Sequence, residues 1–446
     1  MGGMNHRLKA ESNMKMLMIH SWNENEKTYR GRFSNLLSYP SLTLATIYSV
    51  IPGGVFSTIE VVDENSQRVV YDKEQYDLVL ISFDTSSSLT AYKHCREFRK
   101  RGSYVVCGGY HATALPEEVS EHCDTVISGP AEVSIPQFID DFTNGRPEKF
   151  YKNKDICAAK YPIPSRDKIT QKKKLKIPAL IADRGCNNSC KYCSMSTMWR
   201  SNPRPVMDVV NELVELGSKM AIFYDPNFFG NREYAISLMN ALLPLKRLWA
   251  ANATADFGYD HELMKLAYES GCRAVLIGLE SMNTKSLASA AKRFHAAENY
   301  KEIIDNIHSY GIAVNGCFVL GFDHDTEEEL LSLPQRVDYL GLDLCRFGIL
   351  TPYPGTLFFE EYQKSGRIIS RDWSRYSQHY AVFKPAHMTP ERLDEIYRKV
   401  WKEAYSWRRV FTRTFRSAWR NKPYVVVLFG ANIGFKFLGI GKRSAK

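Results

Sequence analysis

Short apolar runs rich in β-branched residues alternate with segments of helix length along most of this chain, and this alternation most constrains its fold. Strands that are separated by helices favour parallel sheets with the helices packed against them. A length of 446 residues suggests two to three domains, and 44% hydrophobic residues are ordinary for a globular protein. We therefore predict an α/β fold.

The first 145 residues predict a doubly wound, Rossmann-like domain. Helices are expected at 42–51 and 88–101, and strands are expected at 14–21, 56–63, 77–84, 104–110 and 125–129. Ligands of such sheets bind at the carboxyl ends of the strands, where Ser82, Gly108, Gly109 and Gly129 stand. Alternatively, the glycines serve only tight turns, an interpretation that we favour less. No G-x-G-x-x-G follows the first strand, which argues against a dinucleotide site.

A second series of strands follows a linker at 146–175, which is rich in charge and proline. Between 176 and 360 we expect six strands, at 177–185, 219–228, 248–257, 274–281, 314–322 and 344–350. Six strands are fewer than the eight of a closed barrel, so a partial (β/α)6 barrel is predicted. Residues 361–446 are expected to form a helical, basic region.

Cys186, Cys190 and Cys193 have the spacing C-x3-C-x2-C, with Tyr192 before the last cysteine. Three thiolates on one loop can hold three corners of a [4Fe-4S] cube and leave one iron open for a ligand. A structural zinc site would need a fourth protein ligand, and none stands nearby. The other seven cysteines lack ligand spacing and are predicted to be small buried residues: Cys95, Cys107, Cys123, Cys157, Cys272, Cys317 and Cys345.

The cysteine motif resembles the signature of the radical S-adenosylmethionine (SAM) superfamily. The stretches YPSLTLATIYSVIP, ISFDTSSS, CGGYHATALPEE and VISGPAEVSIPQF are similar to the cobalamin-binding domain that precedes the barrel in one branch of that superfamily. The resemblance implies three cofactors: a [4Fe-4S] cluster, SAM and cobalamin. It further implies cleavage of SAM to a 5'-deoxyadenosyl radical and methyl transfer from methylcobalamin.

The family's contacts carry over to named positions of this chain. SAM contacts are expected at Tyr192, Asp225, Asn227 and Glu280, and cobalamin contacts at Ser82, Gly108, Gly109 and Gly129. Glu280 is expected to bind a ribose hydroxyl pair from a strand end. The D-x-H-x-x-G motif of other cobalamin proteins is absent, since residues 21–31 read SWNENEKTYRG. We therefore expect no protein histidine on cobalt, and we expect His20 and His111 to be structural.

The tail after residue 407 holds ten Lys or Arg and no Asp or Glu, which equals the net charge of +10 for the whole chain. Ile396, Val400, Ala404, Trp407, Phe411 and Phe415 recur at helical spacing, flanked by arginines. Such a basic amphipathic helix either lies on an anionic membrane surface or caps the barrel with a solvated basic face. The glycine-broken segment 424–441 is too interrupted to span a bilayer. No nucleic-acid recognition fold accompanies the charge, so no nucleic-acid partner is expected.

Taken with the resemblance, these features predict a cobalamin-dependent radical SAM methyltransferase that acts on an unactivated carbon of a small molecule or lipid. A cobalamin-dependent cyclase or rearrangement enzyme would share every motif, and a non-catalytic iron-sulfur sensor is an alternative of another class. The resemblance implies an electron donor of flavodoxin or ferredoxin type. The polar N-terminus predicts a cytoplasmic protein, and the membrane-surface interpretation of the tail would place it peripherally on the inner membrane face.

Overall fold

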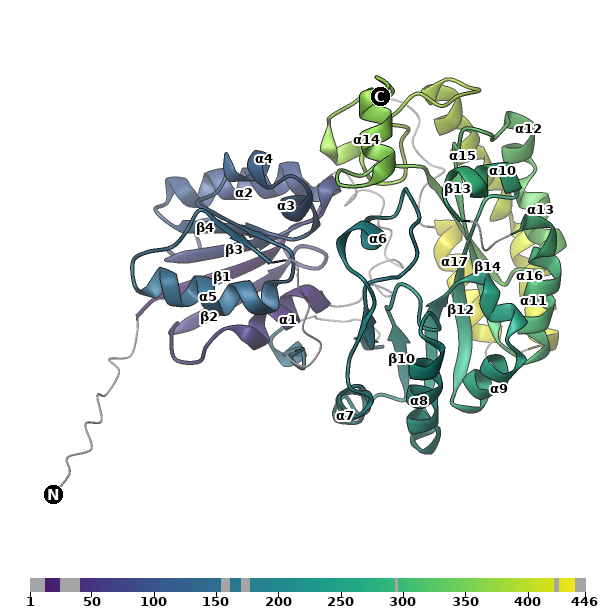
Figure 1. Cartoon of the computed structure of the whole chain (residues 1–446), viewed down its shortest axis with the longest axis horizontal. Coiled ribbons are helices and arrows are strands. Elements are labelled where there is room, and N and C mark those ends of the chain that lie inside the picture. Colours follow the sequence, from purple (N-terminus) through teal and green to yellow (C-terminus); the bar gives the residue numbers. More distant parts are fainter. Residues whose placement is uncertain are drawn as a thin grey trace. The chain divides into compact units, whose positions relative to one another are not determined.

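The computed structural model describes residues 13–24, 41–153, 161–169, 177–292, 296–420 and 425–437 (Figure 1). The chain forms two compact units, of which the first contains the described residues up to 169 and the second those from 177 onward. The first unit thus continues past the predicted boundary at residue 145. Two contacts tie this extension to the first unit. Ile169 is buried in the core of that unit, and the Ser165 N–H donates to the Ala45 carbonyl (3.0 Å).

The first unit is built on a six-stranded sheet in the order β2-β1-β3-β4-β5-β6, and every neighbouring pair is parallel. The strands are β1 (Lys15–His20), β2 (Thr58–Asp63), β3 (Leu78–Ser82), β4 (Tyr104–Gly108), β5 (Thr125–Ser128) and β6 (Phe150–Lys152). The five predicted strands are all present. β6 lies in the stretch predicted as linker, because three residues among charges and prolines give no strand pattern.

Helices cover both faces of this sheet (Figure 1). One face packs against α1 (Leu42–Val50) and α5 (Ala131–Thr143), and the other against α2 (Ser88–Lys100), α3 (Tyr110–Ala114) and α4 (Pro116–Ser120). The strands are buried on both sides, so they read as continuous apolar runs in the sequence. The carboxyl edge of the sheet is left for the turns that follow β3, β4 and β5.

The second unit contains another parallel six-stranded sheet, in the order β14-β13-β12-β11-β10-β7. The strands are β7 (Ala179–Leu180), β10 (Met220–Phe223), β11 (Leu248–Ala253), β12 (Cys272–Glu280), β13 (Ala313–Leu320) and β14 (Leu344–Ile349). Each of the six predicted segments overlaps one of them, although β12 and β13 begin before the predicted starts at 274 and 314. The predicted α/β fold with parallel sheets is therefore confirmed.

One face of this sheet is covered by helices that share a single apolar core with it. They are α7 (Val206–Glu215), α8 (Arg232–Leu242), α9 (His261–Glu269), α11 (Tyr300–Ser309), α13 (Leu333–Leu340) and α15 (Pro390–Ala404). Along β13 and β14, buried residues alternate with partly or fully exposed ones. Alternate side chains therefore point to the opposite face, which we call the inner face.

The first predicted strand of the barrel is shorter than expected. Only Ala179 and Leu180 pair with β10, and the chain then leaves the sheet to form β8 (Asp183–Arg184), antiparallel to β9 (Asn202–Pro203). The buried Asp225 carboxylate accepts the Ala182 N–H (2.7 Å) at the point of departure. This deviation leads directly into the cysteine loop.

The C-terminal segment is helical, but the predicted apolar stripe falls on two helices. Ile396, Val400 and Ala404 are buried on α15, whereas Trp407 and Phe411 are exposed on α16 (Trp407–Arg420). The remaining helices of the unit are α6 (Ser194–Met198), α10 (Thr284–Ser289), α12 (Glu327–Leu331), α14 (Leu357–Lys364) and α17 (Val425–Phe437). Within the described residues, no helix is both long and apolar enough to cross a membrane.

Candidate active site

The three motif cysteines lie on the loop between β8 and α6 (Figure 1). Gly185 enters the loop with φ +98°, and a Cβ at this position would overlap the Arg200 carbonyl oxygen, so the turn requires glycine. The Cys186 N–H donates to the Trp199 carbonyl (3.1 Å) and the Cys193 N–H to the Cys190 carbonyl (3.1 Å). The backbone thus fixes the loop at both of its ends.

The thiols of the loop are near enough to one another to interact electrostatically. Burial raises the pKa of Cys186, and it raises the pKa of Cys190 to about 11, so metal binding by these thiols would have to release their protons. In the part of the chain that the structure describes, no three His, Cys, Asp or Glu side chains are grouped to hold a single metal ion. In a four-iron cluster each thiolate binds a different iron, so the three cysteines need not converge on one point.

Glu280 stands at the end of β12 in an unusual backbone conformation. Its φ is +65°, and the pairing with β13 shifts register between Gly278 and Glu280. The side chain forms a buried ion pair with Lys292 (2.8 Å), whose ammonium also donates to the Gly278 carbonyl (2.6 Å). A non-glycine residue at positive φ costs about 1–3 kcal/mol and persists where its surroundings hold it, as is common at functional sites.

Gly278 makes room for this ion pair. A Cβ at residue 278 would overlap the Glu280 carboxylate and lie 3.0 Å from the Lys292 ammonium. Lys292 was not predicted from the sequence, since it lies 12 residues beyond Glu280 and belongs to no motif. The charges of Lys292 and Glu280 both act on the Cys190 thiol, so the pair is close to the cysteine loop.

Tyr192 joins the cysteine loop to Glu280. Burial, followed by the negative charge of Glu280 and a hydrogen bond to it, raises the pKa of the Tyr192 hydroxyl well above its ordinary value. The Tyr192 ring packs against Phe322 and Phe358, with centroids 5.9 and 6.5 Å away. The structure therefore brings together Tyr192, Glu280 and the cysteines, which lie far apart in the sequence.

Asp225 and Asn227 occupy the turn after β10, at the carboxyl end of that strand. The Asn227 amide donates to the Thr254 hydroxyl (3.1 Å). Among the described residues, the second carboxylate oxygen of Asp225 and the side-chain oxygen of Asn227 are buried without a hydrogen-bond partner. Burial raises the pKa of Asp225 to about 8. Two buried acceptors without donors fit a ligand that supplies N–H or O–H groups.

The four predicted cobalamin contacts lie at the carboxyl edge of the first unit's sheet. Ser82 and Gly108 are register partners at the ends of β3 and β4. Gly109 (φ +105°) and Gly129 (φ +87°) lie in tight turns where a Cβ would overlap backbone oxygens of Phe83 and Asn153 respectively.

Those two glycines are therefore explained by their turns alone. A Cβ on Gly108 would have no neighbour closer than 3.6 Å, and Gly108 has no positive φ. Ser82 and Gly108 consequently remain the stronger ligand candidates of the four.

The two histidines of this unit differ in their surroundings. His111 is fully buried and contacts Thr85 (3.3 Å) and the hydroxyl of Tyr92 (3.1 Å), as expected of a structural histidine. The Nδ1 atom of His20 is buried without a hydrogen-bond partner among the described residues. Most of the loop that lacks the D-x-H-x-x-G motif, from residue 25 onward, lies outside the described residues.

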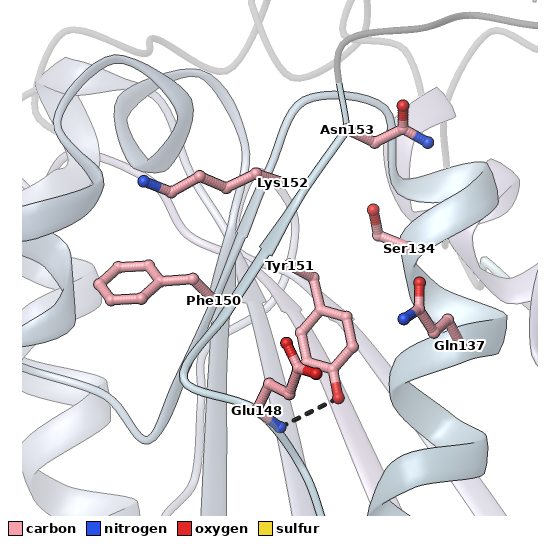
Figure 2. Close-up of a pocket in the computed structure, with 7 residues that line it drawn as sticks. All are labelled: Ser134, Gln137, Glu148, Phe150, Tyr151, Lys152 and Asn153. Atoms are coloured by element: carbon pink, nitrogen blue, oxygen red, sulfur yellow. Dashed lines mark hydrogen bonds between the residues drawn. The ribbon is translucent and has the colours of Figure 1, made fainter.

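A polar cavity of about 270 Å³ lies between β6 and α5 of the first unit (Figure 2). The Tyr151 hydroxyl accepts the Glu148 N–H there (3.0 Å) and donates to Asp141 (2.9 Å). The lining residues are Ser134, Gln137, Glu148, Phe150, Tyr151, Lys152 and Asn153. None of them is a predicted contact, so the cavity adds no residue to the candidate site.

Comparison with known proteins identifies the cysteine-bearing unit. Residues 181–335 match the model of the radical SAM superfamily. This segment is a radical SAM domain. It contains the cysteine loop, Asp225, Asn227 and Glu280, and the resemblance predicted from the cysteine motif is thereby confirmed.

Two curated relatives come from Chlorobaculum tepidum. The chain is 28% identical over 364 residues to a bacteriochlorophyllide d C-12(1)-methyltransferase, covering 79% of each protein. It is 29% identical over 403 residues to the bacteriochlorophyllide d C-8(2)-methyltransferase, covering 85% of this chain and 87% of the relative. Both matches thus cover about four-fifths of this chain or more.

A solved structure has a similar fold. It is the radical SAM methyltransferase TsrM from Kitasatospora setae with cobalamin and a [4Fe-4S] cluster bound, with a TM-score of 0.64 and 14% identity, covering 87% of this chain and 81% of TsrM. At this identity the likeness concerns the fold. It extends over both units, including the first, which lies outside the match to the superfamily model.

Proposed function

We propose that this protein is a cobalamin-dependent radical SAM enzyme that methylates an unactivated carbon of a tetrapyrrole. The observation that carries the proposal is the juxtaposition of a three-cysteine loop with Glu280, Lys292 and Tyr192 in a radical SAM domain. The substrate class follows from the two relatives that act on bacteriochlorophyllide d. A tetrapyrrole is a narrower substrate class than the small molecule or lipid that the sequence predicted.

Cys186, Cys190 and Cys193 would each bind one iron of the cluster. Asp225 and Asn227 would accept hydrogen bonds from SAM with their unpartnered buried oxygens, and Glu280 would bind its ribose hydroxyls. Lys292 would hold the Glu280 carboxylate in place, and Tyr192 would bridge it to the cysteine loop. When bound, cluster, SAM and cobalamin supply the electron, the carbon radical and the methyl group, while the protein positions them.

The first unit, residues 1–145 as predicted and its extension to residue 169, would be the Rossmann-like cobalamin domain. Its sheet order begins 2-1-3-4-5, the doubly wound order that places ligands at the carboxyl edge. Ser82 and Gly108 meet at that edge, and Gly109 and Gly129 shape the adjoining turns. The second unit would be the partial barrel, with residues 361–446 as its helical extension.

Anaerobic reconstitution tests the proposed function. The variant Cys186→Ala, Cys190→Ala, Cys193→Ala should retain almost no iron and form no 5'-deoxyadenosine, whereas a Cys272→Ala control, which loses a buried thiol outside the motif, should retain both. Iron retention by the triple variant would refute the cluster assignment. With a chlorin substrate, the wild-type product should be heavier by one methylene group.

Two alternatives remain distinguishable in the same experiment. A cyclase or rearrangement enzyme would form 5'-deoxyadenosine without adding a methyl group. A non-catalytic iron-sulfur sensor would keep its cluster but would neither bind nor cleave SAM. The two relatives named as methyltransferases support methylation over both.

The enzyme would also need a reductant, for which we propose an electron donor of flavodoxin or ferredoxin type. A peripheral membrane contact is supported by the exposed aromatic face of α16, formed by Trp407, Phe411 and Phe415. Arg408 is exposed beside this face and Lys436 lies over the Trp407 ring (4.6 Å). An apolar face flanked by cations is typical of helices that lie on anionic lipid.

A further inference from the structure

The inner face of the barrel sheet carries an arginine whose role is not explained by the sites described above. Gly278, Cys317 and Arg346 are register partners on β12, β13 and β14. The residues on either side of Arg346 point the other way, since Cys345 and Phe347 are buried in the core shared with α15. Arg346 itself is exposed. Its side chain therefore projects from the inner face.

This face is the one that the candidate SAM residues occupy. Burial raises the pKa of the Cys317 thiol to about 12, and the charges of Arg346, Glu280 and Lys292 all act on that thiol. Glu280 and Lys292 act in turn on Cys190 of the cluster loop. A continuous series of neighbours thus links the cysteine loop to Arg346 across three strands.

Within the described residues, the guanidinium of Arg346 forms no hydrogen bond and no ion pair. Other arginines of the same unit have acidic partners: Arg204 pairs with Glu212, Arg367 with Asp323 and Arg392 with Glu327. An arginine that presents its guanidinium to a substrate face without an acceptor is suited to bind an anionic ligand.

The carboxylate that acts on the same Cys317 thiol, Glu280, is already ion-paired with Lys292 (2.8 Å). Burial, followed by the positive charge of Arg346, lowers the pKa of His379 to about 4, so this neighbour is neutral. Its Nδ1 atom is engaged by the Tyr397 hydroxyl (2.6 Å). Gly348 lies two residues further along β14, and the neutral side chain of Gln378 lies 3.2 Å from where a Cβ at residue 348 would stand.

We propose that Arg346 binds a carboxylate of the substrate, and that this carboxylate is a propionate side chain of the tetrapyrrole. The planar guanidinium can bind a carboxylate with two parallel hydrogen bonds. Such a contact would fix the orientation of the macrocycle and thereby select the carbon that faces the radical. The inference rests on the proposed function for the identity of the substrate.

The test compares two probes that differ only in the carboxylates, protoporphyrin IX and its dimethyl ester. Binding to the cluster- and cobalamin-loaded enzyme is followed by porphyrin fluorescence. The wild type should prefer the free acid by about tenfold or more, the size of one charge-assisted hydrogen bond. Arg346→Gln should lose this preference without weaker binding of the ester, and Arg346→Lys should keep part of it. Arg232→Gln, which removes an exposed arginine of α8, is the matched control.

Cleavage of SAM to 5'-deoxyadenosine without porphyrin is measured in the same samples. Unchanged cleavage in Arg346→Gln supports a substrate contact, whereas lost cleavage or weaker SAM binding would overturn the proposal, because the arginine would then serve SAM. Three further results would overturn the proposal. The wild type could bind acid and ester equally, it could bind neither, or the preference for the acid could survive in Arg346→Gln. The proposed radical SAM chemistry fails separately, if the wild type forms no 5'-deoxyadenosine.

Discussion

At the scale of single residues, the site depends on buried polar groups that the fold holds without a full set of partners. Asp225 is the clearest case, because its carboxyl is buried, accepts one backbone N–H and leaves its other oxygen unpartnered among the described residues. Burial raises the pKa of this group from 3.8 to about 8. The folded protein therefore keeps a proton that the unfolded chain loses.

This shift predicts a pH-dependent stability. The contribution of Asp225 is fully present below about pH 4 and is lost as pH rises to about 8, since only the folded state still binds the proton between these values. Asn cannot ionise, so Asp225→Asn should match the wild type near pH 4 and exceed its Tm near pH 8 by on the order of 2 °C or more. Thermal unfolding without SAM measures this. A Tm difference that does not change with pH would contradict the shift.

Residue roles were only partly predictable from the sequence. The cysteine spacing and the order of strands led us to expect Cys186 and Glu280 in one site, and the structure brings both close to Lys292. Lys292 and Arg346 could not be found in this way. Lys292 reaches Glu280 from a different element, and Arg346 differs from a surface arginine only by strand register and the absence of a partner.

At the scale of elements, strand patterns were predictable wherever a strand is buried on both faces, as β3 and β4 are. The sequence did not predict β6 or the point at which the chain leaves the sheet after β7. Both depend on pairing with distant segments rather than on local pattern. The C-terminal stripe shows the same limit. The apolar residues of this stripe keep helical spacing across residue 405, so the sequence predicts one continuous helix. In the structure α15 ends there, and the Tyr405 hydroxyl donates to the Cys345 carbonyl (2.6 Å).

The turn after β4 offers a matched pair of substitutions. Gly109→Ala should destabilise the first unit by about 1–3 kcal/mol, because its φ is +105° and a Cβ would overlap the Phe83 carbonyl oxygen. Gly108→Ala should leave stability unchanged, since its Cβ meets nothing closer than 3.6 Å. If cobalamin lies at this edge, Gly108→Ala should still weaken cobalamin binding by about tenfold, as judged by equilibrium dialysis. Unchanged binding in a folded Gly108→Ala protein would place the cofactor elsewhere.

At the scale of the whole molecule, the excess positive charge lies in the tail, but much of it is engaged within the fold. Arg413 is buried and donates to Asn432 (3.0 Å), and Arg416 donates to the Asp338 carbonyl (2.7 Å). Arg409 bonds the Pro334 carbonyl (2.7 Å) and Glu403 (3.0 Å). The predicted basic face is therefore partly a structural cap. This leaves the aromatic face of α16, with Phe415 75% exposed, as the main candidate for a lipid contact.

Co-sedimentation of the full chain with anionic and neutral vesicles tests this contact. We expect the protein to bind anionic vesicles chiefly through the aromatic side chains. Added salt should weaken this binding, because it screens the few remaining exposed cations. The double variant Phe411→Ser, Phe415→Ser should abolish binding, since neither ring is buried in the fold. The control is Tyr259→Ser, which removes an exposed aromatic side chain of the segment Ala255–Tyr259 and should not affect binding. Equal sedimentation of the double variant and the wild type would show that α16 does not contact lipid. Equal binding to neutral vesicles would show that the tail's charge plays no part.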